Sequence, residues 1–358
     1  MYQLIISDLH LGKGKFLKNG QLNILEDFEE DDRIYEFFKY YSSGEYYTEK
    51  IHLILNGDIL NLIQIDIEGI FTHIVDEEIT FKALQKIYDG HPLFFQGIRE
   101  FLSAPNKRVT YIIGNHDAAM GFEGAQKLFK KLVGDVNFCY ELKEFGVHVE
   151  HGHRFEAINT VPKEKYFLEG PWGKKILNLP WGSLFCIYIL PRLKKDRPYI
   201  DKIRPIISYV KWCSIHDFSF FLKMFHTVVS YLIQTKFDIY TKQNRNFRTT
   251  FKVLKQITIY PRYEKKAKSI LKKNHNIHTV VMGHTHLREW RRFPHDKYYF
   301  NTGTWNTIPS IDAGMHQNEA VFTYCLLKVS EKENCLVEGK LNNWKGRWKP
   351  FSEDVIVS

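Results

Sequence analysis

The stretch Leu53–Asn61 constrains this chain more than any other. It reads Leu-Ile-Leu-Asn-Gly-Asp-Ile-Leu-Asn, which predicts a buried strand that ends at a glycine and at the carboxylate of Asp58. A run of Leu and Ile is typical of a parallel strand covered on both faces, and ligand-binding side chains gather at the carboxyl ends of such strands. Asp58 is therefore a candidate to bridge two metal ions. The alternative is a loop aspartate that caps the next helix.

Four other predicted strand ends carry polar clusters of the same kind. Strands are expected at residues 3–7, 108–113, 145–150 and 278–282. The clusters that follow them are Asp8-Leu9-His10, Gly114-Asn115-His116-Asp117, His151-Gly152-His153 and Gly283-His284-Thr285-His286. Residues two apart in extended backbone point to one side, so Asp8 with His10 predicts half of a metal site. Each cluster alone is equally a polar turn, but the set is what a site at one sheet edge requires.

Size and cysteine content set the broad class. The chain has 358 residues, which predicts one large domain or a domain with an insertion. Its five cysteines show no Cys-x-x-Cys spacing, which argues against a disulfide framework or a zinc knuckle and favours a reducing compartment. The first residues already read as a strand and show no secretory signal, so we expect a cytoplasmic location.

The order of the clusters carries a family resemblance. Asp-x-His, Gly-Asp, Gly-Asn-His-Asp, His-Gly-His and Gly-His-x-His, from residue 8 to residue 286, resemble the calcineurin-like metallophosphoesterase superfamily. The resemblance implies an α/β fold, a four-layer α/β/β/α sandwich around two sheets, here with a helical insertion. It also implies a centre of two divalent metal ions that activates water against a phosphoryl group.

The resemblance also implies a role for each matched residue. One metal ion would be held by Asp8, His10 and His286, the other by Asn115, His151 and His284, and Asp58 would bridge them. His116 matches the histidine near the leaving group, a general acid, and Asp117 its orienting partner. His151 is the favoured ligand of its pair, and His153 is a ligand or an outer neighbour. Nitrogen and oxygen donors without thiolate suit manganese, the expected metal, or iron or zinc.

Helical patterning is expected at 34–41, 76–103 and 123–133. Further strands are expected at 298–305 and 320–329, with a closing hairpin at 335–356.

The middle of the chain predicts an inserted lid at residues 155–275. From Arg154 to His275 there are 25 Lys and Arg against 8 Asp and Glu, a net charge of +17, and many aromatic residues. Residues 206–237 read as apolar helix that is too interrupted for a bilayer span. We expect amphipathic helices that meet a membrane surface peripherally. The alternative is an extra helical layer whose aromatic residues form its own core.

This insertion resembles that of the UDP-2,3-diacylglucosamine hydrolases, a group within the superfamily. That likeness implies hydrolysis of a lipid-linked pyrophosphate at the membrane surface. The group differs in two motifs: it has Gly-Asn-Arg-Asp and His-Gly-Asp, where this chain has Gly-Asn-His-Asp and His-Gly-His. The candidate phosphate contacts are Arg154, Arg288, Arg291 and Arg292. Two rival hypotheses are a nuclease or nucleotide phosphodiesterase whose insertion holds nucleic acid, and a non-catalytic metal-binding scaffold.

Overall fold

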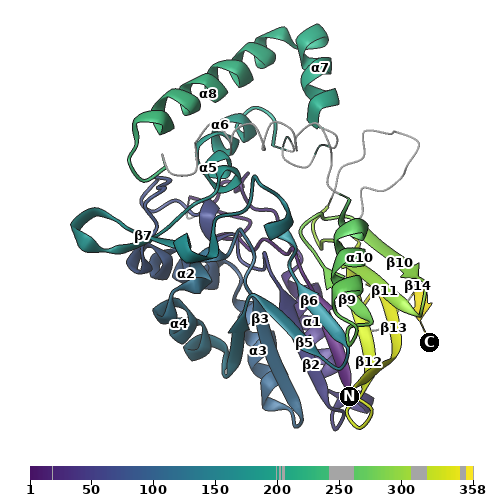
Figure 1. Ribbon diagram of the computed structural model, residues 1–358. Coiled ribbons are helices and arrows are strands. Elements are labelled where there is room, and N and C mark those ends of the chain that lie inside the picture. Colours follow the sequence, from purple (N-terminus) through teal and green to yellow (C-terminus); the bar gives the residue numbers. More distant parts are fainter. Residues whose placement is uncertain are drawn as a thin grey trace.

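The computed structural model describes residues 1–17, 19–198, 200, 203, 206–241, 262–307, 321–346 and 352–357. Two main sheets pack face to face (Figure 1). The larger sheet consists of β1 (Tyr2–Ile6), β2 (Ile51–Asn56), β3 (Lys107–Ile112), β4 (Val136–Cys139), β12 (Phe322–Ser330), β13 (Cys335–Trp344) and β14 (Ser352–Val357). The smaller sheet consists of β5 (Glu141–Glu144), β6 (Val147–Glu150), β9 (Thr279–Met282), β10 (Arg288–Phe293) and β11 (Lys297–Thr302).

Each sheet has a parallel centre that matches the predicted strands. The strand order is β14–β13–β12–β1–β2–β3–β4 in the larger sheet and β10–β11–β9–β6–β5 in the smaller. Strands β1 to β4 run parallel to one another, and β6, β9 and β11 do the same. The strand expected before Asp58 is confirmed as β2, and those expected at 3–7, 108–113, 145–150 and 278–282 are confirmed as β1, β3, β6 and β9. Their carboxyl ends therefore lie together.

Helices cover the outer face of each sheet, which confirms the four-layer α/β/β/α arrangement. The larger sheet is covered by α1 (Asp31–Tyr41), α2 (Glu77–Gly90), α3 (Pro92–Ser103) and α4 (Glu123–Val133), and the smaller by α10 (Tyr263–Lys273). Side chains alternate between two cores in each strand: Ile54 lies between the sheets, whereas its neighbours Leu53 and Leu55 pack under the helices. Such alternation is what a strand buried on both faces requires.

The segment between β6 and β9 contains most of the remaining elements. They are β7 (Phe167–Glu169), β8 (Lys175–Leu177), α5 (Trp181–Tyr188), α6 (Leu190–Lys194), α7 (Ile206–His216), α8 (Phe218–Phe237) and α10. The helical prediction for 206–237 is confirmed, with a break at Asp217, whose side chain accepts a hydrogen bond from the backbone N–H of Phe220. Part of the predicted lid, residues 199, 201–202, 204–205 and 242–261, lies outside the described residues.

The insertion lies mainly on one side of the sandwich. In Figure 1, α7 and α8 lie beyond α5 and α6, on the side away from the two sheets. Helix α10, at the end of the predicted lid, packs on β9 and β11 instead. Among the described helices, none has the length and apolar character needed to cross a bilayer.

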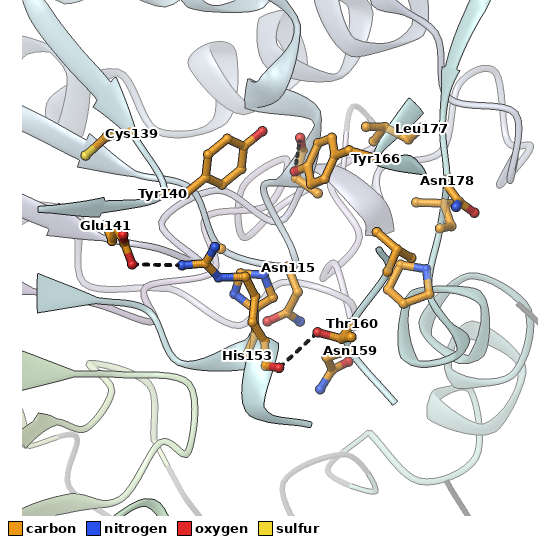
Figure 2. Close-up of a pocket in the computed structure, with 16 residues that line it drawn as sticks. Asn115, Cys139, Tyr140, Glu141, His153, Asn159, Thr160, Tyr166, Leu177 and Asn178 are labelled. Carbon is orange, nitrogen blue, oxygen red and sulfur yellow. Dashed lines mark hydrogen bonds and ion pairs between the residues drawn. The ribbon is translucent and has the colours of Figure 1, made fainter. Parts of the chain in front are cut away.

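A cavity of about 430 Å³ lies where the insertion meets the sheets (Figure 2). One side is formed by Gly114, Asn115 and Ala118, which follow β3, and by residues 139–141, where β4 ends and β5 begins. The other side is formed by residues of the range 153–180.

Candidate metal centre

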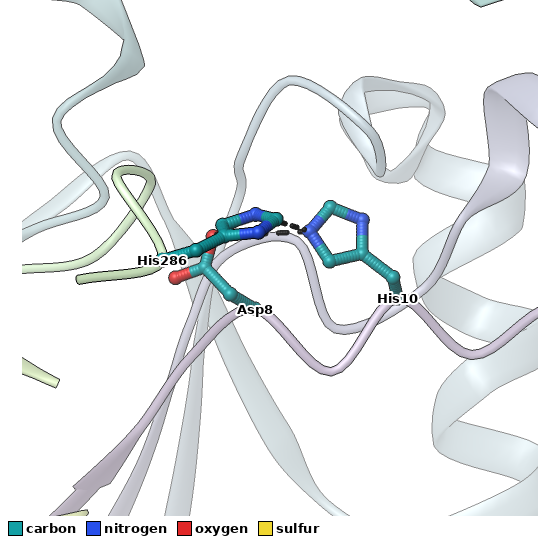
Figure 3. A group of neighbouring side chains, drawn as sticks. All are labelled: Asp8, His10 and His286. Carbon is teal, nitrogen blue, oxygen red and sulfur yellow. Dashed lines mark hydrogen bonds and ion pairs between the residues drawn. The ribbon is translucent and has the colours of Figure 1, made fainter. Parts of the chain in front are cut away.

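Three predicted ligands from opposite ends of the chain meet at the end of β1 (Figure 3). Oδ1 of Asp8 lies 3.5 Å from Nε2 of His286 and 3.9 Å from Nε2 of His10. The two histidine Nε2 atoms are 3.0 Å apart. One carboxylate and two imidazoles that converge in this way form a donor set suited to a divalent transition metal.

Asp58 connects this group to a second one. Its Oδ2 lies 3.9 Å from Nε2 of His10 and 3.1 Å from Nε2 of His151. Candidate ligand atoms of Asp58, His151 and His284 all lie within 4.8 Å of one another. The carboxylate of Asp58 thus lies between the two groups of predicted ligands, where a bridging ligand is required.

In the part of the chain that the structure describes, two buried atoms of the seven predicted ligands have no hydrogen-bond partner. They are Oδ1 of Asn115 and Nε2 of His151, and the latter has only its ion-pair contact with Asp58. The other ring nitrogen of His151, Nδ1, lies 2.8 Å from the backbone oxygen of Asn56 and donates its proton there, so Nε2 is the nitrogen left to bind a metal ion. Buried polar atoms are normally paired, because leaving them unpaired costs about 1–3 kcal/mol. Metal coordination would satisfy both atoms, so the residues present fit a metal pair.

Glu156 is a residue of this site that the sequence did not predict. Its Oε2 lies 3.0 Å from Nε2 of His284 and accepts a hydrogen bond of 2.8 Å from the side chain of Asn159. With Nε2 directed at the carboxylate, Nδ1 is the nitrogen of His284 left for a metal ion. Carboxylates commonly orient metal-binding histidines in this way. The only sequence signal is the position of Glu156, a few residues after His153.

The backbone at the ligands differs from the extended conformation that the sequence predicted. Asp8, His10, Asp58, His284 and His286 all have φ between 52° and 70°, in the left-handed region. Such a conformation costs of order 1–3 kcal/mol for a residue other than glycine. The same-side placement of Asp8 and His10 thus comes from two strained turns beyond the end of β1, not from the alternation of a strand.

Glycines make room for the carboxylates. A Cβ atom on Gly114 would lie 2.2 Å from Oδ1 of Asp58, and one on Gly283 would lie 2.5 Å from Oδ2 of Asp8. These distances are too short for any side chain, so the Gly in Gly-Asn-His-Asp and in Gly-His-x-His is required by close approach.

The electrostatics keep the carboxylates ionised. Burial alone would raise the pKa of Asp8 and of Asp58, but the charges and hydrogen bonds of His151 and the other neighbouring histidines together outweigh burial and lower both, that of Asp58 well below its usual range. Burial opposes protonation of His151, yet the charges of Asp58 and Asp8 raise its pKa to about 10. The site therefore attracts positive charge strongly, as a cation site must.

His116 has a different partner from the predicted one. Its Nδ1 lies 2.9 Å from Oδ1 of Asn61, to which it donates. The carboxylate of Asp117 instead accepts hydrogen bonds from Tyr111 Oη at 2.6 Å and from the backbone N–H groups of Ile59 and Gly114. By these contacts Asn61, and not Asp117 as predicted, is the residue that orients the ring of His116. Asp117 supports the loops that carry Asp58 and His116.

His116 and Asp117 both have shifted pKa values. Burial and the charge of His10 lower the pKa of His116 to about 3, so this histidine is neutral at pH 7 and Nε2 is its proton-accepting atom. Burial and the charge of Asp58 raise the pKa of Asp117 to about 6. Catalysis by a protonated His116 would therefore need the negative charge of a bound phosphoryl group beside it.

The arginines predicted to contact phosphate have different surroundings in the structure. Arg154 lines the cavity that Asn115 and His153 also line. Arg288 is exposed at the start of β10, two residues after His286. Arg291 forms ion pairs with Glu289 and Glu264. Their contact with phosphate stays a prediction.

His153 is buried beside the ligands. Its ring centroid lies 5.5 Å from that of His151 and 6.3 Å from that of His284.

A family model for calcineurin-like phosphoesterases matches residues 1–288. The chain belongs to this family. The matched range contains all the residues of the centre described above, so the family's dependence on a pair of metal ions agrees with the two groups of converging donors. Comparison with curated proteins finds no match.

Several solved structures resemble the chain at low sequence identity. A dimetal phosphatase from Danio rerio has a TM-score of 0.38 and 10% identity, over 100% of this chain and 98% of that one. Vps29 from Entamoeba histolytica, complexed with zinc, has a TM-score of 0.34 and 13% identity, over all of both chains. A predicted phosphoesterase from Streptococcus pneumoniae has a TM-score of 0.29 and 10% identity, over 98% and 95%. At these TM-scores the likenesses do not bear on function.

Proposed function

We propose that the protein is a two-metal hydrolase of a phosphate ester or pyrophosphate. The observation that carries the proposal is the position of Asp58, whose Oδ2 lies 3.9 Å from His10 on one side and 3.1 Å from His151 on the other. Asp8, His10 and His286 would hold one ion, and Asn115, His151 and His284 the other. Two divalent ions so held supply an activated water and stabilise charge on the phosphoryl oxygens.

The residues of the chain have separate tasks in this reaction. The left-handed turns and the glycines hold the ligands in place before substrate arrives, which reduces reorganisation during the reaction. His116, fixed through Asn61, presents Nε2 as the atom that accepts or returns a proton near the leaving oxygen. Arg154 lines the adjoining cavity, where its guanidinium would contact a phosphate oxygen.

Metal reconstitution tests this proposal directly. Protein stripped with a chelator is reloaded with manganese, iron or zinc, and its metal content is compared with turnover of bis(4-nitrophenyl) phosphate and 4-nitrophenyl phosphate. We expect turnover to require two bound ions per chain, with manganese the first candidate. Two bound ions without turnover of either ester would support the non-catalytic scaffold instead.

The surface of α7 and α8 favours a lipid-linked substrate at an anionic membrane. Large apolar side chains are exposed there, among them Phe225 (62%) and Phe237 (77%), together with Trp212, Ile215, Phe218, Leu222 and Ile233. We call this set the α7–α8 apolar surface. Exposed apolar groups of this extent mark binding surfaces, and the +17 net charge of residues 154–275 complements anionic lipid.

Vesicle flotation separates this proposal from the nuclease hypothesis. We expect the protein to float with vesicles that contain phosphatidylglycerol, to float less with phosphatidylcholine alone, and to lose binding as salt rises. Retention on nucleic acid without flotation would favour the nuclease.

A further inference from the structure

The cavity next to the candidate metal centre has the dimensions of a small-molecule site. Its volume of about 430 Å³ falls within the range of organic-ligand pockets, roughly 300–1,000 Å³. Asn115 and His153 form one end of it, so any group bound there lies beside the position where a phosphoryl group would react (Figure 2).

Two tyrosines form an aromatic wall of this cavity. The rings of Tyr140 and Tyr166 meet edge to face, with centroids 5.4 Å apart and planes at 73°. The hydroxyl of Tyr166 donates to the backbone oxygen of Ala118 at 2.9 Å, which holds its ring in place. In Figure 2 both rings lie across the cavity from Asn159 and Thr160. An edge-to-face pair of this kind presents a ring face and a ring edge to a third ring.

The cavity also contains a cation, the guanidinium of Arg154. Arg154 is 24% exposed and contacts Glu141 at 3.5 Å and Glu150 at 3.6 Å, both through Nη2. An aromatic wall together with a cation and Asn115 of the metal centre matches a ligand that carries both a ring and a phosphate.

We propose that this cavity, the Tyr140–Tyr166 pocket, binds a planar aromatic ring carried by the phosphorylated substrate. The inference rests on the proposed function, because it orients the ring's phosphate toward Asn115 and Arg154. A ring suits the pocket better than an alkyl chain for two reasons. Aromatic partners gain from stacking and edge contacts beyond area burial, and a rigid ring loses little conformational entropy on binding.

Phosphonates that resist hydrolysis test the pocket without turnover. Binding of methyl-, phenyl- and octylphosphonate to the manganese-loaded protein is measured by calorimetry. We expect phenylphosphonate to bind about tenfold more tightly than methylphosphonate. Octylphosphonate that binds more tightly than phenylphosphonate would overturn the proposal in favour of an alkyl site. Competition by AMP against ribose 5-phosphate then distinguishes a nucleobase from a simple aryl group as the source of the ring.

Substitutions in the cavity test whether the preference for phenylphosphonate arises there. In Tyr140→Ala the advantage of phenylphosphonate over methylphosphonate should fall to about twofold or less, because the stacking partner is lost. Thr160→Trp, at an exposed position on the cavity's edge, should have the same effect by filling the pocket. Tyr47→Ala is the matched control, since Tyr47 is 51% exposed and is not part of the cavity. An unchanged phenyl advantage in both pocket variants would refute the assignment.

The experiments distinguish a wrong assignment of the ring-binding pocket from a wrong assignment of the hydrolase activity. Turnover of bis(4-nitrophenyl) phosphate is measured on the same preparations. Turnover without any phenyl preference refutes the pocket alone. A phenyl preference that depends on Tyr140, without turnover, refutes the hydrolase alone.

Discussion

The carboxylate of Glu156 lies 3.0 Å from Nε2 of His284, although 128 positions separate the two residues in the chain. The side chain of Asn159 donates to the same carboxylate oxygen, and Glu156 is held largely out of solvent. Burial alone would raise the pKa of Glu156, but the charge of His284 and hydrogen bonds lower it, so the carboxylate is ionised. This contact occupies Nε2 of His284, which leaves Nδ1 as the nitrogen available to a metal ion.

Loss of Glu156 should weaken the metal site. Glu156→Leu removes the acceptor that orients His284, so we expect the affinity for the more weakly held ion to fall about 10–100-fold, and Glu156→Gln to lie between Leu and wild type. Metal titration followed by elemental analysis measures both. Glu169→Gln, an exposed glutamate, is the control. Equal metal affinity in wild type and Glu156→Leu would show that the contact has no positioning role.

Asp58→Asn should abolish the reaction while it preserves the shape of the side chain. The bridging charge is lost, so we expect turnover to fall by at least about 10³-fold and metal content to drop below two ions per chain. Asp66→Asn, which removes a carboxylate paired with Lys13, is the matched control and should retain both ions. Two bound ions and near-normal turnover in Asp58→Asn would exclude a bridging role.

His116→Gln should separate chemistry from metal binding. We expect both ions to remain and kcat to fall about 10²–10⁴-fold, the usual contribution of a general acid or base. Asn61→Leu should lower kcat by less, because it loosens the ring without removing it. Elemental analysis and steady-state kinetics check both variants. Loss of an ion in His116→Gln would identify His116 as a ligand.

His91 should make stability depend on pH, away from the metal centre. Burial would lower its pKa, but hydrogen bonds to Asp31 and Glu26 raise it to about 9. The folded pKa is above the unfolded value, so this contribution is complete below pH 6.5 and is lost as pH rises through 9. In urea unfolding, His91→Gln should be more destabilising at about pH 5.5 than at about pH 10, by roughly 3 kcal/mol. The exposed His275→Gln is the control, and a pH-independent difference would contradict the prediction.

Acidic substitutions on the α7–α8 apolar surface should weaken membrane binding. Phe225→Asp and Phe237→Asp each remove an exposed ring and add a negative charge, so we expect vesicle partitioning to fall about tenfold for each. Leu22→Asp, at a residue 56% exposed on another part of the molecule, should partition like wild type. Equal losses in all three variants would mean that the added negative charge lowers binding wherever it is placed, and that the α7–α8 apolar surface is not the binding site.

Most of the fold was readable from local sequence. A strand buried on both faces requires a continuous apolar run, and Leu53–Leu55 has no polar interruption. The strands β1, β2, β3, β6 and β9 and the polar clusters next to them were therefore predicted close to their observed bounds, whereas β4 was not predicted. The β7–β8 hairpin was not predicted, because its strands are short and partly exposed and leave little periodic signal.

The amino-acid sequence by itself determined the family, the strands and the residues at their ends, because each ligand directly follows the strand that carries it. Only the tertiary structure decided which neighbours support those ligands. Glu156 reaches His284, and Asn61 rather than Asp117 reaches His116, through the paths of separate loops. The left-handed backbone at Asp8 and Asp58 likewise depends on contacts that hold a strained conformation. Such contacts join positions far apart in the chain, so no local pattern of residues encodes them.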